Sequence, residues 1–160
     1  MSFITVQVTN LHETNDKLTK LALSMHNFES AMVEVGKALE HYFGTDVFES
    51  EGGALGSRWK ALSEPYGSVK RRTYDGRLIL EKTGHLRKSW YSEADPMSVF
   101  ISNNARTPKG ANLFAIHQLG TGSGTGRGHN IPARPMMGIN EPVKSIIGQI
   151  IEADIRSKID

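Results

Sequence analysis

The chain of 160 residues is 38% hydrophobic and carries a formal net charge of +2, which fits one domain with a modest core. It contains no cysteine, which excludes disulfides, thiolate nucleophiles and cysteine-ligated metals and is consistent with a reducing cytosol. No run of about 18 apolar residues occurs, so we expect no transmembrane helix. The N-terminal residues also lack the basic start and long apolar core of a signal peptide.

The charge is distributed unevenly along the chain. Residues 1–56 hold three basic and eight acidic side chains, a net charge of −5, whereas residues 57–90 hold nine basic and three acidic ones, a net charge of +6. The remaining residues sum to about +1. Such a division allows copies of a chain to pair with one another or to line something charged, and it also fits ordinary solvated faces.

Two elements are predicted in the N-terminal third. Residues 3–8 alternate in character and are rich in β-branched side chains, which predicts a short strand. From about residue 15 to residue 43, apolar side chains recur at alternating spacings of three and four, which predicts one helix roughly 40 Å long. Its apolar stripe packs either within the domain or partly against a neighbouring subunit. The stripe consists of Leu18, Leu21, Met25, Phe28, Met32, Val35, Leu39 and Tyr42.

Short elements separated by loops are predicted in the middle of the chain. Residues 44–57 are rich in glycine and indicate a loop. Ser63 is then a suitable N-cap for a short helix that has Pro65 in its first turn. Thr83 is expected to cap a second short segment rather than to supply a functional hydroxyl.

The second half of the chain predicts a hairpin and two further helices. Residues 89–93 and 97–103 indicate strands joined by a turn, a short helix is expected over 112–119, and residues 133–140 indicate a closing strand. Residues 142–159 place apolar side chains on one broad face and predict a C-terminal helix. We therefore expect a single α+β domain over all 160 residues, in which a long N-terminal helix and the C-terminal helix pack on an antiparallel sheet of about four strands.

Glycine alternates with other residues from Gly120 to Gly128, within a loop predicted over about residues 120–130. A P-loop would need a lysine after the glycines, and a dinucleotide-binding loop would need a different glycine spacing. The two prolines that follow cannot start a helix aimed at a phosphate. The composition is instead typical of a flexible arm, which a protein keeps either because something else orders it or because it must stay mobile. Its candidate contact residues are Gly122, Gly124, Gly126 and Arg127.

Groups suited to catalysis or metal binding are few. The six histidines form no H-x-x-x-H pair, and no G-x-S-x-G nucleophile motif occurs. His117 lies among apolar residues and is expected to be packed rather than to bind a ligand. We therefore expect no catalytic, metal or cofactor site. The rival hypothesis is a hydrolase that uses His117 and a nearby acid, and it requires a carboxylate within hydrogen-bond reach of that ring.

The basic run "SVKRRTYDGR" supports an alternative function as a small nucleic-acid-binding module based on residues 70–88. No sequence signature of an RNA-binding, helix-turn-helix or zinc module accompanies the run. A solvated patch or one that faces another subunit explains the same charges. The residues that this alternative would use are Lys70, Arg71, Arg72, Arg77, Arg87 and Lys88.

Four short motifs occur in order: "RWKALSEPY" with a trailing "KRR", "ILEKTGHLRKSW", "FAIHQLGTG" and "IPARPMMGI". Over about residues 40–158 the chain thereby resembles the phage virion morphogenesis family, the Mu-like tail completion proteins of the head–tail neck. Phe114 stands where tyrosine is usual, and Met136-Met137 stand where Phe-Leu is usual, so apolar bulk is kept. The resemblance assigns structural roles to Trp59, Leu62, Tyr66, Thr83, Gly84, Leu86, His117, Gly120, Pro132, Pro135 and Gly138.

The resemblance implies a structural virion protein that is assembled in the host cytoplasm and is located at the head–tail junction. It implies a ring of identical subunits that makes the tail competent to join a DNA-filled head. A hexamer is the first expectation for this ring, and a dodecamer is the second. The partners would be other copies of the chain and adjacent neck, connector or tail-tube proteins. DNA would pass through the lumen of the ring, and no membrane would be involved.

Such a ring requires one surface to complement a different surface on the next copy, and an acidic first third and a basic second third meet that requirement. Lys70, Arg71 and Arg72 are the predicted contacts in the basic part, together with the glycine-rich arm. Arg134 lies between prolines in extended backbone. We expect it to be a structural anchor that bonds a carboxylate or carbonyl groups, and a partner contact, rather than a DNA contact.

Overall fold

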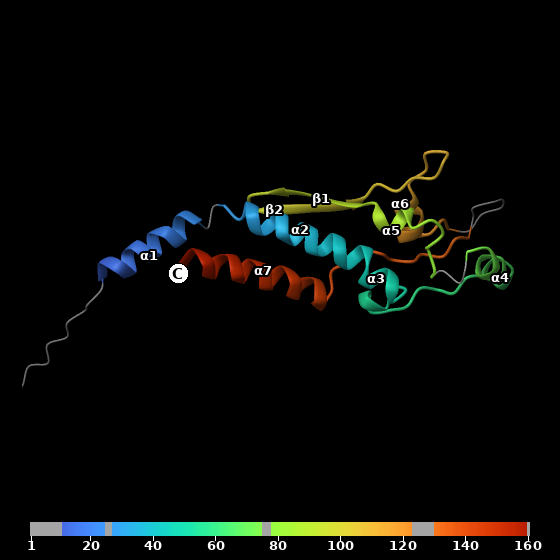
Figure 1. Ribbon diagram of the computed structural model, residues 1–160, viewed down its shortest axis with the longest axis horizontal. Helices are drawn as coiled ribbons and strands as arrows, with labels where there is room; N and C mark the ends of the chain where they lie inside the picture. The colour runs from blue at the N-terminus through green and yellow to red at the C-terminus, as the bar shows by residue number, and fades with distance from the viewer. Residues whose placement is uncertain (1–10, 25–26, 75–77, 123–129, 160) are drawn as a thin grey trace, which may run out of the picture.

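The structure is a computed structural model that describes residues 11–24, 27–74, 78–122 and 130–159. Helices dominate, and the strands form one hairpin (Figure 1). In chain order the elements are α1 (Leu11–Ser24), α2 (Glu29–Gly44), α3 (Asp46–Glu49), the 3-10 turn η1 (Gly53–Leu55), α4 (Glu64–Thr73), α5 (His85–Lys88), β1 (Trp90–Asp95), β2 (Ser98–Asn103), α6 (Leu113–Leu119) and α7 (Glu141–Ile159).

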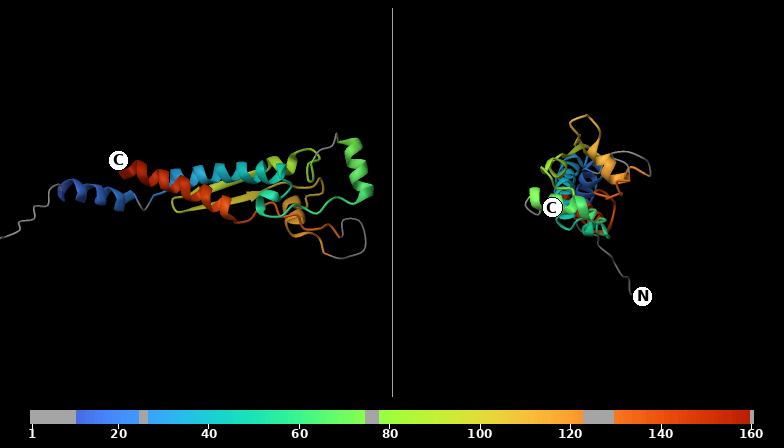
Figure 2. Two further views of the ribbon diagram at one scale, coloured as in Figure 1. Left: turned by 90° about the horizontal axis from the view of Figure 1, so that it is seen from below. Right: turned by 90° about the vertical axis from the view of Figure 1, so that its right-hand side faces the viewer.

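Helix α2 lies at the centre of an elongated body, between the β1–β2 ribbon on one side and α7 on the other (Figure 1). Helix α1 continues beyond the body at the end where α2 begins and contacts α7, whereas α4 crosses the opposite end (Figure 2). The two ends of the long axis are therefore built from different parts of the chain.

The helix and the ribbon approach closely at Gly36. A β-carbon at this position would lie 2.4 Å from the Ser92 hydroxyl, so only glycine allows the contact. One turn later the Ser92 hydroxyl donates to the Glu40 carboxylate at 2.5 Å. Sequence alternation along β1 points Trp90 and Ser92 toward α2, and leaves Glu93 and Asp95 exposed.

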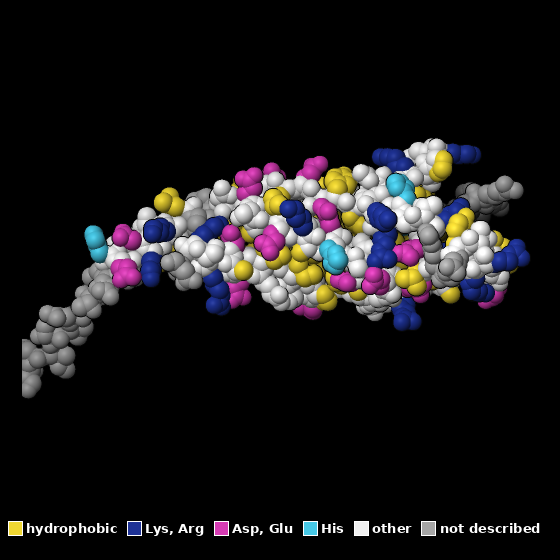
Figure 3. Space-filling model, in the orientation of Figure 1, with side chains coloured by type: hydrophobic (Ala, Val, Ile, Leu, Met, Phe, Trp, Pro, Cys, Tyr) yellow, Lys and Arg dark blue, Asp and Glu magenta, His cyan; other side chains and the backbone are white. Residues whose placement is uncertain are grey.

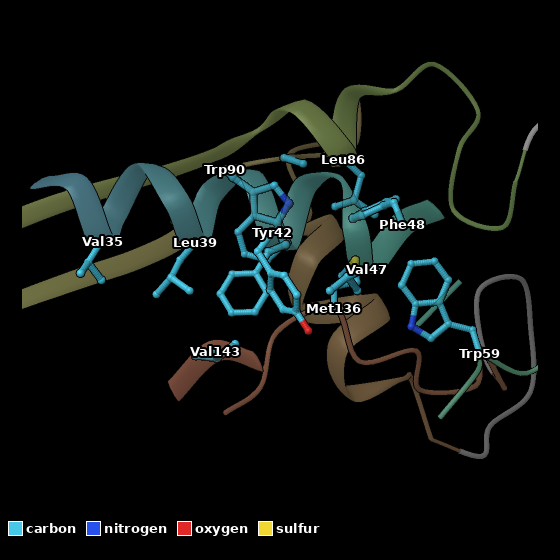
Figure 4. Close-up of a cluster of buried hydrophobic side chains, with 12 residues drawn as sticks. Val35, Leu39, Tyr42, Val47, Phe48, Trp59, Leu86, Trp90, Met136 and Val143 are labelled. Atoms are coloured by element: carbon cyan, nitrogen blue, oxygen red, sulfur yellow. The ribbon is translucent and has the colours of Figure 1, made fainter. Parts of the chain in front are cut away.

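The core runs along α2 and widens around a group of aromatic rings near the C-terminal end of that helix (Figure 4). Trp90 lies 5.3 Å from the ring of Phe43 and 5.5 Å from that of Phe114, and Phe48 packs edge-on against Trp59. Burial of large rings contributes most of the hydrophobic stabilisation in a domain of this size. The fully enclosed cluster consists of Val35, Leu39, Tyr42, Phe43, Val47, Phe48, Trp59, Leu86, Trp90, Ala105, Met136 and Val143.

The prediction of one long N-terminal helix is wrong, because the structure has two helices. Asn27 and Phe28 are not helical: the Asn27 side chain accepts from the backbone of Glu29, and the Phe28 backbone donates to the Pro96 oxygen at 2.8 Å. A side-chain acceptor for a backbone donor favours a break over a continuous helix. Contact with the hairpin turn then fixes where α2 begins.

The α+β class is confirmed, but the expected sheet of about four strands is too large. Within the described residues the sheet has two antiparallel strands, with Trp90 opposite Asn103 and Asp95 opposite Ser98. Residues 133–140 form no strand, since Pro135 lacks a donor and the backbone of Met136 donates to a side chain instead of a ladder. The predicted strand at residues 3–8 lies outside the described residues.

Most of the other predicted elements are confirmed. Ser63 precedes α4 with a proline in the first turn, and Asn112 caps α6 by accepting from the Ala115 nitrogen at 3.0 Å. For α5 the capping position is Gly84 rather than Thr83, whose hydroxyl nonetheless accepts from the His85 nitrogen at 3.3 Å. No described helix combines the length and apolar character that crossing a membrane would require.

Candidate partner-binding cleft

Two of the sequence motifs fold against each other at the end of the molecule that α4 crosses. The backbone nitrogen of Arg134 donates to the backbone oxygen of His117 at 2.6 Å. The Gln118 amide donates to the Met137 oxygen at 2.8 Å and accepts from the Met136 nitrogen at 2.7 Å. These bonds join α6 to the segment over 131–138, which explains why the two motifs occur together.

Gly120 ends α6 with φ of 74° and ψ of −179°. A β-carbon there would lie 2.8 Å from the Ile131 oxygen and 2.9 Å from the Ala133 nitrogen, which are backbone atoms that cannot move aside. The chain crosses itself immediately afterwards, where the Thr121 nitrogen donates to the same Ile131 oxygen at 3.1 Å. Gly120 therefore permits the crossing of two segments.

Arg134 anchors this crossing to the segment before α4. Its side chain is only 4% exposed, and its Nε donates to the Lys60 oxygen at 3.0 Å while Nη2 approaches the Ala61 oxygen at 3.4 Å. Burial lowers the pKa of the guanidinium from its usual value, although arginine remains charged in proteins. The prediction of an anchor bonded to carbonyl groups is confirmed.

Two further side chains fix the same region. The indole nitrogen of Trp59 donates to the Pro135 oxygen at 2.6 Å, which ties the segment before α4 to the one that follows Arg134. Lys70 is 4% exposed, and its ammonium donates to the Leu78 oxygen. Burial lowers the pKa of Lys70, and the carboxylates of Glu81 and Glu51 partly offset that effect.

Between these segments is an open cavity of about 1330 Å³, here called the basic cleft. None of the described residues that line it is acidic, so its positive charges face no carboxylate from within its walls. A group of cations in a concave site attracts a negatively charged partner. The positive and titratable lining residues are Lys60, Lys70, Lys82, His85, Arg106, His117 and Arg134.

The walls of the basic cleft are also apolar. Leucines, an isoleucine and prolines alternate with the cations around it, so a ligand that fits must offer apolar groups as well as negative charge. The apolar lining residues are Leu62, Tyr66, Leu80, Leu86, Pro108, Leu113, Ile131 and Pro132.

His117 contributes to the wall of the cleft, and no acidic residue of the described lining lies beside it. Its Nδ1 is buried and has no hydrogen-bond partner among the described residues. Burial, and then the positive charge of Arg134, lower the pKa of the imidazole below its usual value. Since no described residue that lines the cleft is acidic, the hydrolase hypothesis lacks the carboxylate it requires. No described cluster of His, Cys, Asp or Glu could hold a metal ion.

The basic run is divided between structural and exposed side chains. Arg87 donates to the Gly44 oxygen at 2.8 Å and to the carboxylates of Glu81 and Glu49 at 2.7 Å each, so its charge is neutralised within the fold. Hydrogen bonds to the two carboxylates raise the pKa of Arg87. With Lys70 also buried, the six basic residues of the nucleic-acid alternative do not form one exposed patch, and Arg77 lies outside the described residues.

A model of the phage virion morphogenesis family matches residues 9–156. The chain belongs to this family. A search among curated proteins and a search among solved structures each found no match. Membership makes the chain a structural virion protein that acts in particle assembly.

The predicted contact residues of this virion morphogenesis protein occupy different environments. Lys70 is buried, Arg71 is exposed and pairs with Glu64 at 3.6 Å, and Arg72 is exposed. Gly122 has φ of 60° and open space around it. All of these remain predictions as partner contacts. The arm residues Gly124, Gly126 and Arg127 lie outside the described residues.

Several motif residues of the morphogenesis protein meet at the basic cleft. Its lining includes Leu62, Tyr66, Thr83, Gly84, Leu86, His117 and Pro132, whereas Trp59 and Pro135 form the bond behind it. A β-carbon built on Gly138 would lie 3.9 Å from the Leu55 side chain. Sequence reasoning missed the roles of Gln118, Glu49 and Glu81, because their partners are distant in sequence.

Proposed function

We propose that this virion morphogenesis protein is a tail-completion or neck protein that forms a homo-oligomeric ring at the head–tail junction. The ring makes the tail competent to join a DNA-filled head, and it acts through surface complementarity rather than through chemistry. Its partners are further copies of the chain and the adjacent connector or tail-tube proteins. A hexamer is the first expectation and a dodecamer the second, both from the family resemblance.

The observation that carries this proposal is the chemical difference between two surfaces of the elongated body. The basic cleft lies at the end that α4 crosses and lacks acids among its described lining, whereas exposed acidic side chains lie over the β1–β2 ribbon, alongside α2 (Figure 3). A subunit with two unlike surfaces favours head-to-tail contacts, and such contacts close into rings when the rotation between copies permits. The family match supplies the setting in the virion.

The test is the mass of the native chain by light scattering over a concentration series at low and high salt, with negative-stain images of any large species. A closed ring of about six or about twelve copies supports the proposal. Dissolution of the ring by salt would identify charge as part of the interface. A chain that stays monomeric alone and also fails to join purified tails would contradict the proposal.

A further inference from the structure

The turn between β1 and β2 and the adjoining outer face of the ribbon are both acidic and apolar. Glu93 and Asp95 are exposed, Met97 is 66% exposed and Phe100 is 57% exposed. Glu93 is directly opposite Phe100 in the ladder, which places an acid and an apolar ring side by side on the outer face. These four residues are here called the hairpin tip.

The hairpin tip is held in place by α2. The Phe28 nitrogen donates to the Pro96 oxygen at 2.8 Å, and the Ser98 hydroxyl donates to the Asp95 carboxylate at 3.2 Å. A surface that is already ordered loses little entropy on docking, which favours binding. The turn lies at the end of the ribbon where α2 begins, far from α4 and the basic cleft (Figure 1), so the tip cannot reach the cleft of its own subunit.

The hairpin tip offers what the basic cleft requires. Carboxylates match the cations Lys60 and Arg106, which are exposed at the cleft, and Met97 and Phe100 match its leucines and prolines. A nucleic-acid backbone would supply the negative charge but no partner for the apolar walls, because phosphate contacts are polar. Mixed apolar and cationic walls therefore favour a protein segment over DNA.

Several other exposed acids, in α7 and α1, fit less well because they already have basic partners. Those of α7 are already paired, Glu141 with Lys144 and Glu152 with Arg156, both within about one turn of the helix. In α1 the exposed leucines accompany Glu13, which pairs with Lys17 at 3.6 Å. Neither Glu93 nor Asp95 forms an ion pair with any basic residue in the described part of the chain.

We propose that the hairpin tip of one copy docks into the basic cleft of the next copy, so that Glu93 and Asp95 face Lys60 and Arg106 while Met97 and Phe100 cover the apolar walls. This inference rests on the proposed function and specifies the contact between neighbouring subunits. The interface is head-to-tail, because the tip and the cleft are different surfaces of the subunit.

Cross-linking between two differently substituted chains tests the contact, and the natural lack of cysteine makes every thiol a designed one. One chain carries Met97→Cys at the tip, and the other carries Ser63→Cys at the cleft, where the serine makes no capping hydrogen bond. The control partner carries Ser145→Cys on the exposed face of α7. With a short bis-maleimide, the tip–cleft pair should give at least about tenfold more mixed dimer than the control pair.

Charge reversal then tests the chemistry of the contact. The double variant Glu93→Lys with Asp95→Lys, or the double variant Lys60→Glu with Arg106→Glu, should each lower the cross-linking yield at least about tenfold, because attraction becomes repulsion. Combining the two on opposite chains should restore most of the yield.

The matched controls for these reversals lie on α7, with the same change in net charge. They are Glu141→Lys with Glu152→Lys, and Lys144→Glu with Arg156→Glu. Neither control should alter the yield. Circular dichroism of every variant checks that it is folded, and a variant that fails this check is replaced by the single reversal at Glu93 or Arg106, which are both exposed.

The outcomes separate this inference from the proposed function. If tip–cleft cross-links form and are restored by the paired charge reversals, but the chain never closes a ring, the docking inference is supported and the proposed ring is contradicted. A ring in negative stain whose tip–cleft yield equals that of the control would keep the ring and overturn the docking. A third outcome would also overturn the inference. If no tip–cleft cross-links form, and labelled duplex DNA binds to the native chain but not to the double variant Lys60→Glu with Arg106→Glu, the cleft is assigned to DNA.

Discussion

Arg134 and His117 are joined at the floor of the basic cleft, where the backbone nitrogen of Arg134 donates to the backbone oxygen of His117 at 2.6 Å. Burial is the main cause of the lowered pKa of the His117 ring, and the positive charge of the Arg134 guanidinium is the second cause. The pair connects α6 to the segment before α4, because the Arg134 side chain continues to the carbonyl oxygens of Lys60 and Ala61. Changes at either residue therefore test how the cleft is held together.

Replacement of Arg134 with methionine should destabilise the fold strongly. Methionine preserves much of the length but leaves the Lys60 and Ala61 oxygens without their donor in a site that is 4% exposed. We expect a loss of about 2–4 kcal/mol in the free energy of unfolding, measured by urea denaturation. The control Arg72→Met is exposed and should stay within about 0.5 kcal/mol of the native chain. Equal losses of unfolding free energy for Arg134→Met and Arg72→Met would contradict the anchoring role of Arg134.

The lowered pKa of His117 predicts that stability depends on pH. The ring binds a proton more readily in the unfolded chain, whose pKa is near 6.5, than in the folded one. This contribution to stability is complete above about pH 6.5 and is lost as the pH falls through the folded pKa. As the pH falls from about 6.5 to about 5, the free energy of unfolding should fall by up to about 1.4 kcal/mol per pH unit from this group.

His117→Phe should flatten that dependence, since the ring is kept in shape and the titrating group is removed. The matched control is His85→Phe, a histidine that lines the same cleft but is exposed. Its replacement shows what a histidine-to-phenylalanine change does at an exposed position of the same cleft. Identical slopes for the native chain and His117→Phe would contradict the prediction.

Local sequence signals predicted much of the fold. The hairpin over residues 90–103, the capped helix after Asn112 and the apolar face of α7 all follow from patterns within a few residues of one another. The break between α1 and α2 did not follow, because heptad spacing continues across it. The Asn27 side chain bonds locally to Glu29, but the contact that fixes the start of α2 joins Phe28 to Pro96, residues far apart in sequence.

The cleft was predictable only in part. Motif residues that line it, such as Leu62 and His117, were identified, but as separate structural positions rather than as one cavity. Charge counting along the chain located a basic stretch at residues 57–90. It could not show that the Lys70 ammonium donates its hydrogen bond to the Leu78 carbonyl oxygen. Long-range pairing decides which charges remain available, and one sequence does not reveal that pairing.

Gly120→Ala tests the crossing of the two motifs. The backbone of Gly120 is in a region that other residues rarely adopt, at a cost of about 1–3 kcal/mol, and the new β-carbon would contact the Ile131 oxygen. Gly110 also has positive φ, of 84°, but open space around it, so Gly110→Ala reports backbone strain without the clash. The loss in unfolding free energy should be larger for Gly120→Ala, and a smaller or equal loss would argue against the crossing.

Arg87→Lys tests whether the second motif, "ILEKTGHLRKSW", is structural. The guanidinium reaches the Gly44 oxygen, Glu81 and Glu49 at once, and an ammonium group cannot span all three acceptors. We expect a loss of about 1–2 kcal/mol in urea denaturation, although net charge is unchanged. The matched control is Arg156→Lys, whose side chain is exposed on α7 and pairs with Glu152 alone, so it should change stability by less than about 0.5 kcal/mol. A loss at Arg87 no greater than that at Arg156 would mean that the charge, rather than the three-way bridge, is what the fold requires at this position.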